Sequence, residues 1–249
     1  MPVNYFRSLT GLQRTADANR HLGFALAFVA GAANAGGYLA VHQYTSHMTG
    51  IVSSMADNLA LGNADVVLSG AGGLLSFLTG AACCAVMVNY ARRARMHSQY
   101  AFPLLLEALL LIGFGVLGSR LEAIGGLFVP ATVMLLCFIM GLQNAVITKL
   151  SGAEIRTTHV TGIVTDLGIE LGKLMYWNGA QSSVHPRIVA DRSRLRMLAL
   201  MVSCFFVGGL AGALGFKHIG YLSTLPLALI LIVLAAVPAW DDLATALRR

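Results

Sequence analysis

Six apolar runs, each long enough or nearly long enough to cross a lipid bilayer, constrain this chain more than any other feature. A hydrocarbon core about 30 Å thick requires roughly 20 helical residues. Backbone groups that face lipid must be satisfied within helices or closed barrels. The composition, 57% hydrophobic and 11% charged, excludes an ordinary soluble domain. We therefore expect an all-α, polytopic membrane protein with six transmembrane helices. The runs are Leu22–Tyr44, Val66–Tyr90, Phe102–Gly118, Ile124–Ile147, Leu195–Phe216 and Tyr221–Trp240.

The charged residues between the runs predict the orientation. With a cytoplasmic amino terminus, the inside pieces and the start of the fifth run hold 15 of the 17 Lys and Arg residues, and only Arg120 and Lys217 lie outside. Cytoplasmic loops of membrane proteins carry such an excess. This distribution predicts that both termini are cytoplasmic. It also accounts for the net charge of +6 without a nucleic-acid partner. The inside pieces are 1–21, 91–101, 148–194 and 241–249.

Two motifs occur twice, in the same order. Residues 31–62 hold Gly-x-x-Asn-Ala followed by a hydroxyl-His-x-Thr-Gly-Ile-Val box, and residues 141–172 repeat both. The first motif recurs 110 positions later and the box 112 positions later. We interpret this as a gene duplication. It divides the chain into a cytoplasmic leader, two membrane repeats and a cytoplasmic tail. The boundaries are 1–21, 22–118, 119–240 and 241–249.

Each repeat is expected to contain three spans, and an odd number places the two copies in opposite orientation. Inverted repeats with interrupted helices are a common architecture of secondary transporters. The segments 49–62 and 161–174 would reach only about 20 Å as helices, too short to span. We expect each to be a short re-entrant or interfacial helix.

The Thr-Gly pairs of the two boxes predict where these short helices begin. Thr49 and Thr161 are good N-cap residues. The adjacent Gly50 and Gly162 permit close backbone approach. A helix beginning there would direct free N–H groups and its positive dipole end at a ligand.

Five further polar residues near the boxes are candidate ligand contacts. His47 and His159 could hydrogen-bond a solute or carry a proton near neutral pH. Arg156 could pair with an anion. Asn34 and Asn144 are typical of interhelical hydrogen bonding, with ligand contact as the alternative. The alternative for the boxes is that Thr and His only satisfy backbone groups at a helix break.

Glu107 is an acid well inside an apolar run. Intramembrane acids are costly, so a role in proton or ion coupling is the first hypothesis. The alternative is a buried hydrogen-bond partner for a neighbouring helix, and no acid occupies the equivalent place in the second repeat. The four cysteines lie inside apolar runs without metal-ligand spacing, so we predict free thiols, no metal site and no cofactor.

The chain resembles the YoaK-like bacterial inner-membrane proteins, a family defined by a domain of unknown function. The resemblance rests on Gly-x-x-Asn-Ala with His-Met-Thr-Gly, then Gly-Leu-Gln-Asn-Ala with Arg-Thr-Thr-His-Val-Thr-Gly, and covers about residues 21–239. It implies a multi-pass protein of the bacterial inner (plasma) membrane and supplies no substrate. The family usually has Asp in place of Asn34 and Asn in place of Ile51. A proton or cation step that depends on that Asp would be missing here.

Three function classes follow from these features. The leading one is a small-solute transporter or permease that works by alternating access between the repeats, as a possible homodimer on grounds of size. The second is a membrane scaffold or sensor subunit. The third is an intramembrane enzyme that uses His47 or His159 on a lipid substrate. The sequence has no nucleophile elbow or phosphate-binding loop, so we do not expect an enzyme.

Overall fold

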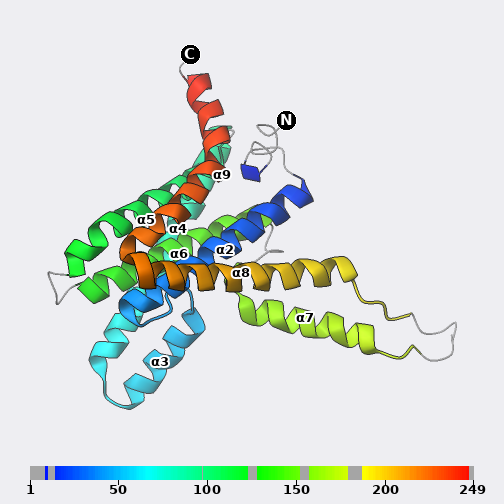
Figure 1. The fold of residues 1–249 in the computed structure, drawn as a ribbon, viewed down its shortest axis with the longest axis horizontal. Helices are drawn as coiled ribbons and strands as arrows, with labels where there is room; N and C mark the ends of the chain where they lie inside the picture. The colour runs from blue at the N-terminus through cyan, green and yellow to red at the C-terminus, as the bar shows by residue number, and fades with distance from the viewer. Residues whose placement is uncertain are drawn as a thin grey trace.

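The computed structural model describes residues 9–10, 15–96, 98–122, 128–151, 157–178 and 187–246, and the regular elements in these ranges are all helical. The α-helices, drawn in Figure 1, are α2 (Ala16–Val41), α3 (Met48–Ala60), α4 (Ala64–Arg93), α5 (Ala101–Glu122), α6 (Phe128–Ser151), α7 (Val160–Met175), α8 (Arg192–Ile219) and α9 (Thr224–Ala246). A short 3-10 turn, η1 (Gly220–Ser223), joins α8 to α9.

Among the described residues, five helical stretches are long and apolar enough to cross a membrane, which confirms the predicted class of all-α polytopic membrane protein. The last stretch, Arg192–Thr245, is 54 residues long and contains α8, η1 and α9. The helices α3 and α7, with 13 and 16 residues, are shorter than a span. The other stretches are Asp17–Val41, Ala64–Arg93, Ala101–Gly118 and Pro130–Ser151.

The helices extend beyond the apolar runs because backbone hydrogen bonding does not stop where side chains become polar. The helix α2 begins at Ala16, since the Thr15 hydroxyl accepts a hydrogen bond from the N–H of Ala18 at 3.1 Å. It ends where His42 adopts a left-handed conformation, with φ of 54°. At the other end of the chain, α9 continues past the predicted end of its run to Ala246.

The long helices pack in pairs that correspond between the two halves of the chain. The helix α2 packs against α8, which it crosses obliquely in Figure 1, and α4 packs against α6. If α2 corresponds to α6, and α4 to α8, each of these two contacts is the counterpart of the other. The contact of α5 with α9 and that of α2 with α6 join corresponding helices. The short helices follow the same rule, because α3 packs on α4 and α7 packs on α8.

Glycines allow the paired helices to approach closely. A Cβ atom on Gly31 of α2 would overlap the backbone carbonyl oxygen of Phe205 in α8. The corresponding Gly141 of α6 has the same relation to the carbonyl oxygen of Phe77 in α4. On the partner helices, a Cβ atom on Gly80 of α4 would overlap a carbonyl oxygen of α6, and one on Gly208 of α8 would overlap a carbonyl oxygen of α2. The two helix pairs therefore use the same contact at equivalent positions.

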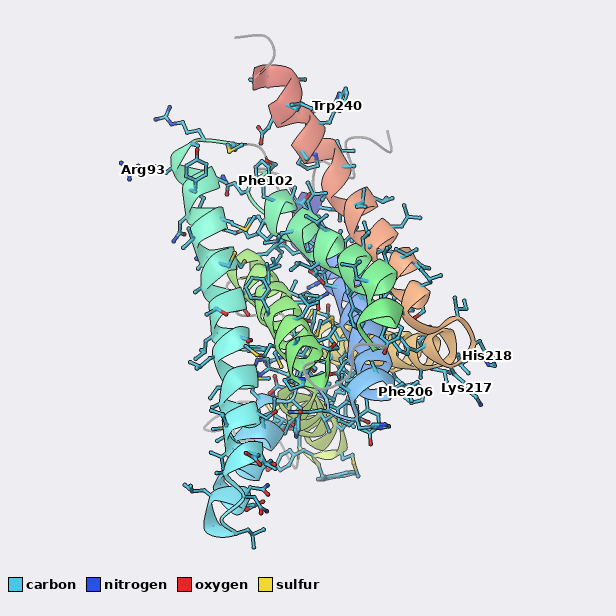
Figure 2. All side chains as sticks on the ribbon, turned by 90° about the vertical axis from the view of Figure 1, so that its left-hand side faces the viewer. Arg93, Phe102, Phe206, Lys217, His218 and Trp240 are labelled. Atoms are coloured by element: carbon cyan, nitrogen blue, oxygen red, sulfur yellow. The ribbon has the colours of Figure 1, made fainter. Side chains whose placement is uncertain are left out.

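The outer surface of the bundle carries many exposed apolar side chains, among them Leu68, Val86 and Phe206. This exposure would be unfavourable in water and suits a lipid-facing surface. In Figure 2, Arg93 and Trp240 lie at the upper end of the helices, whereas Lys217 and His218 lie well below them. The separation agrees with the two sides assigned from charge, and which side is cytoplasmic remains a prediction.

Candidate functional site

An asparagine on a long helix holds the start of the short helix in each repeat. Asn34 on α2 accepts two hydrogen bonds at Oδ1, from the Ser46 backbone N–H at 3.2 Å and the Ser46 hydroxyl at 3.0 Å. Asn144 on α6 accepts one at Oδ1 from the Thr158 hydroxyl at 2.6 Å. Both asparagines are buried. Sequence analysis expected bonds to neighbouring helices, whereas these bonds go to the loop before the short helix of the same repeat.

The short helices begin earlier than the boxes predicted. His47 and His159 are the N-cap residues, and their carbonyl oxygens accept the first helical bonds, from the N–H groups of Ile51 and Ile163 at 3.1 Å. Thr49 and Thr161 lie in the first turn instead, so their assignment as N-caps is wrong. Neither histidine side chain caps its helix. The first-turn N–H groups of both helices are therefore not satisfied by the N-cap side chain.

The two histidines differ in their relation to the neighbouring glycine. The ring of His47 lies against the backbone of Gly50, because a Cβ atom at position 50 would overlap the imidazole. A Cβ on Gly162 would meet nothing within 4 Å, so the ring of His159 does not lie there. Both histidines are exposed. The repeated sequence thus has two different side-chain arrangements.

A buried threonine precedes each box, and sequence reasoning missed both. Thr45 and Thr157 are each 1% exposed, and their hydroxyl oxygens have no hydrogen-bond partner among the described residues. A buried polar group left unpaired costs about 1–3 kcal/mol. The two threonines also align at the offset of the boxes, 112 positions, and that alignment is the signal that could have identified them.

A cavity of about 390 Å³ lies beside α3 in the first repeat, between the end of α2 and the start of α4. His42, His47, Tyr38 and Tyr44 line it, together with residues of α3 and α4. The rings of Tyr38 and Tyr44 stack with centroids 4.5 Å apart, and the His42 ring meets Tyr38 edge-on at 6.0 Å. The cavity therefore offers imidazole and phenol groups beside apolar surface.

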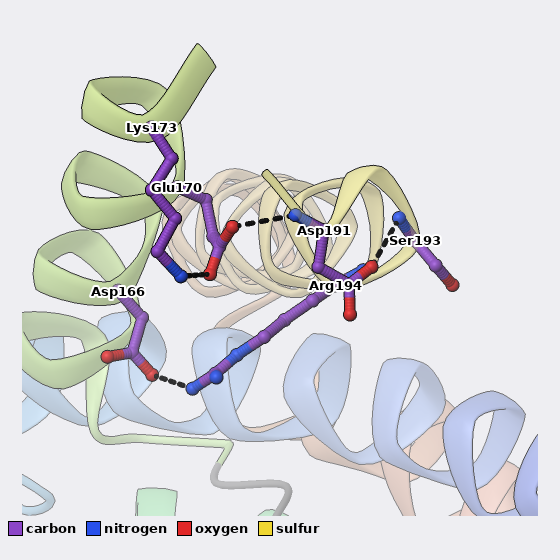
Figure 3. A network of polar contacts seen from close by, with 6 residues as sticks. All are labelled: Asp166, Glu170, Lys173, Asp191, Ser193 and Arg194. Carbon is purple, nitrogen blue, oxygen red and sulfur yellow. Dashed lines mark hydrogen bonds and ion pairs between the residues drawn. The ribbon is translucent and has the colours of Figure 1, made fainter. Parts of the chain in front are cut away.

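The equivalent place in the second repeat contains an ion pair. Ser54 and Val66 line the first-repeat cavity on α3 and α4. Their counterparts, 112 and 128 positions later, are Asp166 and Arg194. Figure 3 shows the Arg194 guanidinium donating to the Asp166 carboxylate at 2.9 Å. In addition, the cavity-lining Gly70 is replaced by Leu198, whose side chain is buried.

A second carboxylate fixes the end of α7 to the start of α8, as Figure 3 also shows. Glu170 accepts hydrogen bonds from the Lys173 ammonium at 2.7 Å and from the Asp191 backbone N–H at 2.8 Å. These two bonds, that from Lys173 first, lower the pKa of Glu170 below its ordinary value. In the first repeat, the corresponding hydrogen bond between the end of α3 and the start of α4 is uncharged. There the Asn63 side-chain amide donates to Asn58 Oδ1 at 3.0 Å.

Glu107 lies on α5, fully buried, and neither of its carboxyl oxygens has a hydrogen-bond partner among the described residues. It is not among the residues that line the first-repeat cavity. Arg156 lies outside the described residues. Within the described part of the chain, no group of three or more His, Cys, Asp or Glu side chains is placed to hold a metal ion.

Residues 22–237 match the model of a protein family described as "Protein of unknown function (DUF1275)". The chain belongs to this family. The UPF0700 transmembrane protein YoaK of Bacillus subtilis (strain 168) is 29% identical to this DUF1275 chain over 195 residues. The alignment covers 76% of the chain and 80% of that relative. No solved structure matches the chain. The predicted resemblance to YoaK-like proteins is confirmed.

Two positions at which this DUF1275 protein departs from the expected family pattern lie within the site. Asn34 holds Ser46, and an aspartate there could accept the same two hydrogen bonds while carrying a charge. Ile51 lines the cavity and packs with Val41 and Cys137 in a small apolar cluster. Relative to the expected family pattern, Ile51 makes the cavity lining less polar, whereas Asn34 is not among the residues that line the cavity.

Proposed function

We propose that this DUF1275 protein is a small-solute transporter or permease of the bacterial inner membrane. It would work by alternating access between two inverted three-helix repeats. In this proposal α2, α4 and α5 are the spans of the first repeat, and α6, α8 and α9 those of the second. The corresponding helix contacts and the paired glycines support this division. Helices α3 and α7 would be the short re-entrant or interfacial segments.

The observation that carries the proposal is the difference between equivalent places in the two repeats. Beside α3 there is a cavity of about 390 Å³, and beside α7 the corresponding positions hold the Asp166–Arg194 ion pair and buried Leu198. A transporter with inverted repeats exposes its binding region to one side at a time, so one repeat should be open while the other is closed. This asymmetry favours transport over a scaffold that is packed equally in both repeats.

The chemistry of the cavity suits a small polar solute. Its volume lies within the range of small-molecule pockets, roughly 300–1,000 Å³. His42 and His47 can donate or accept hydrogen bonds, and the stacked Tyr38 and Tyr44 supply an aromatic wall. Glu107 remains the candidate for proton or ion coupling, because it is a carboxyl group buried in an apolar helix without a hydrogen-bond partner among the described residues.

Flux measurements in proteoliposomes test the proposal. Purified protein should take up at least one member of a panel of small metabolites with saturable kinetics. His47→Ala should reduce uptake roughly tenfold, the effect of losing about 1.4 kcal/mol of solute binding. His218→Ala is the matched control, since His218 is exposed near the end of α8 and does not line the cavity. The proposal fails if the panel produces neither flux nor thermal stabilisation of the protein.

A further inference from the structure

The connection between α7 and α8 has no equivalent in the first repeat. Three residues, 61–63, join α3 to α4, whereas sixteen residues, 176–191, join α7 to α8. The base of this longer connection is closed by the Asn178 side chain. Its amide donates to the Ile188 carbonyl at 2.9 Å, and its Oδ1 accepts from the Ile188 N–H at 3.0 Å. These two bonds bring the chain neighbours Trp177 and Arg187 to the same closed base, and both line one cavity.

A cavity of about 350 Å³ lies at this base, and three cations, Lys173, Arg187 and Arg192, line it. The two nearest carboxylates are already engaged. Glu170 accepts from Lys173 and from the Asp191 N–H, and the Asp191 carboxylate caps α8 through the N–H groups of Ser193 and Arg194. Among the described residues, Arg187 and Arg192 form no ion pair. The cavity is therefore positively charged and lacks an internal counter-ion for these two arginines.

Exposed aromatic and apolar side chains border the same cavity. Trp177 is 87% exposed and Val189 is 70% exposed, and Tyr176 lines the cavity together with them. The stretch long enough to cross the membrane begins at Arg192, which is one of the cavity residues. Trp and Tyr beside cations at the end of a span are typical of the headgroup level of a bilayer. The cavity thus lies where a lipid headgroup would meet it.

We propose that this cavity binds the phosphate-bearing headgroup of an anionic phospholipid in the leaflet next to the start of α8. Arg187 and Arg192 would contact the phosphate, since a guanidinium donates two parallel hydrogen bonds to phosphate oxygens. Trp177 would lie against the glycerol and upper acyl region. The continuity of the site with a membrane span favours lipid over free phosphate as its source. This binding is independent of solute transport, because the cavity is separate from the one lined by His47.

The test uses Trp177 as its own reporter. The chain has two tryptophans, so Trp240→Phe leaves Trp177 as the single fluorophore. This variant is reconstituted into phosphatidylcholine bilayers containing increasing amounts of brominated phosphatidylglycerol or, separately, brominated phosphatidylcholine. Brominated phosphatidylglycerol should quench Trp177 with an apparent affinity roughly tenfold higher, and Arg187→Gln with Arg192→Gln should bring the two lipids within about twofold. Single Arg187→Gln and Arg192→Gln variants, each with a partial loss, provide the same readout if the double variant fails to fold.

Arg93→Gln with Arg95→Gln is the matched control, because these arginines are also exposed at the end of a long helix, α4, but do not line the cavity. The control should retain the preference for phosphatidylglycerol. Equal quenching by both lipids overturns the proposal, as does an equal loss in the control pair. Competition by millimolar inorganic phosphate would identify a free-anion site and also overturn the lipid assignment.

Discussion

We predict that the Asp166–Arg194 ion pair stabilises the closed arrangement that we propose for the second repeat. Its two side chains are about half exposed, with 41% and 50% of their surfaces accessible. Exposed ion pairs usually contribute between about 0 and 1 kcal/mol. Asp166→Asn should therefore weaken the closed arrangement by up to about 1 kcal/mol. The population of a minor open state would then rise by up to roughly fivefold.

The rise can be measured through Leu198, which is buried and lies four residues after Arg194 on α8. Leu198→Cys is introduced after the four native cysteines are replaced, and its reaction with N-ethylmaleimide is followed in nanodiscs, where both sides are accessible. Only the open state reacts, so if the ion pair contributes about 0.4–1 kcal/mol to closure, Asp166→Asn should increase the labelling rate by about two- to fivefold. The measured quantity is the ratio of rates with and without Asp166→Asn, so any effect of the cysteine itself cancels.

Asp17→Asn is the matched control, since Asp17 forms another exposed ion pair, with Arg20 at 3.4 Å on α2. It should leave the labelling rate of Leu198→Cys unchanged. An unchanged or reduced rate in Asp166→Asn would refute the reasoning that this ion pair closes the second repeat. An equal increase in Asp17→Asn would point instead to general loosening of the protein.

Three further predictions concern stability in detergent. Gly31→Ala should lower the free energy of unfolding by about 1–3 kcal/mol, because the added Cβ would overlap a backbone carbonyl oxygen. Gly113→Ala is the control, since the space around that position is open and the added Cβ should not destabilise the protein. Thermal unfolding of the two variants measures the difference. The pKa of Glu170 in the folded protein is lowered from its ordinary value of 4.5. The stabilising contribution of its carboxylate is therefore complete above pH 4.5 and is lost as the pH falls through the folded-state pKa. Melting temperatures at acidic pH should therefore fall less in Glu170→Gln than in Asp57→Asn. Glu107→Gln should keep or raise the melting temperature, because no hydrogen bond to the described residues is lost. A clear fall would favour the alternative in which Glu107 is a buried hydrogen-bond partner of a neighbouring helix.

The membrane class could be predicted from sequence because it depends on local features, and the internal duplication stays a prediction based on local motifs. Long apolar runs leave helices as the simplest structure, and repeated motifs are visible at a fixed offset. The paired glycines Gly31 and Gly141 were recognisable for the same reason, and the structure gives them equivalent contacts. Helix starts were predicted less well. The hydroxyls of Ser46 and Thr158 donate hydrogen bonds to the asparagines on α2 and α6. The short helices α3 and α7 begin directly after the histidine that follows each hydroxyl residue.

The contacts that distinguish the two repeats could not be predicted, because they join residues far apart in sequence. Asp166 meets Arg194 across the whole connection between α7 and α8, and Glu170 meets the Asp191 N–H in the same way. Which polar residue meets which depends on how the connection folds back, and no local pattern encodes that.

The glycine contacts have a consequence for how the molecule could move. They join α2 to α8 and α4 to α6, so each closely packed pair takes one helix from each half of the gene. A rearrangement that preserves these contacts must carry α2 with α8, and α4 with α6, as two units, with the α2–α6 contact between them. The short helix α7 would travel with the first unit and α3 with the second. The units of motion in this protein would then differ from the units of its sequence.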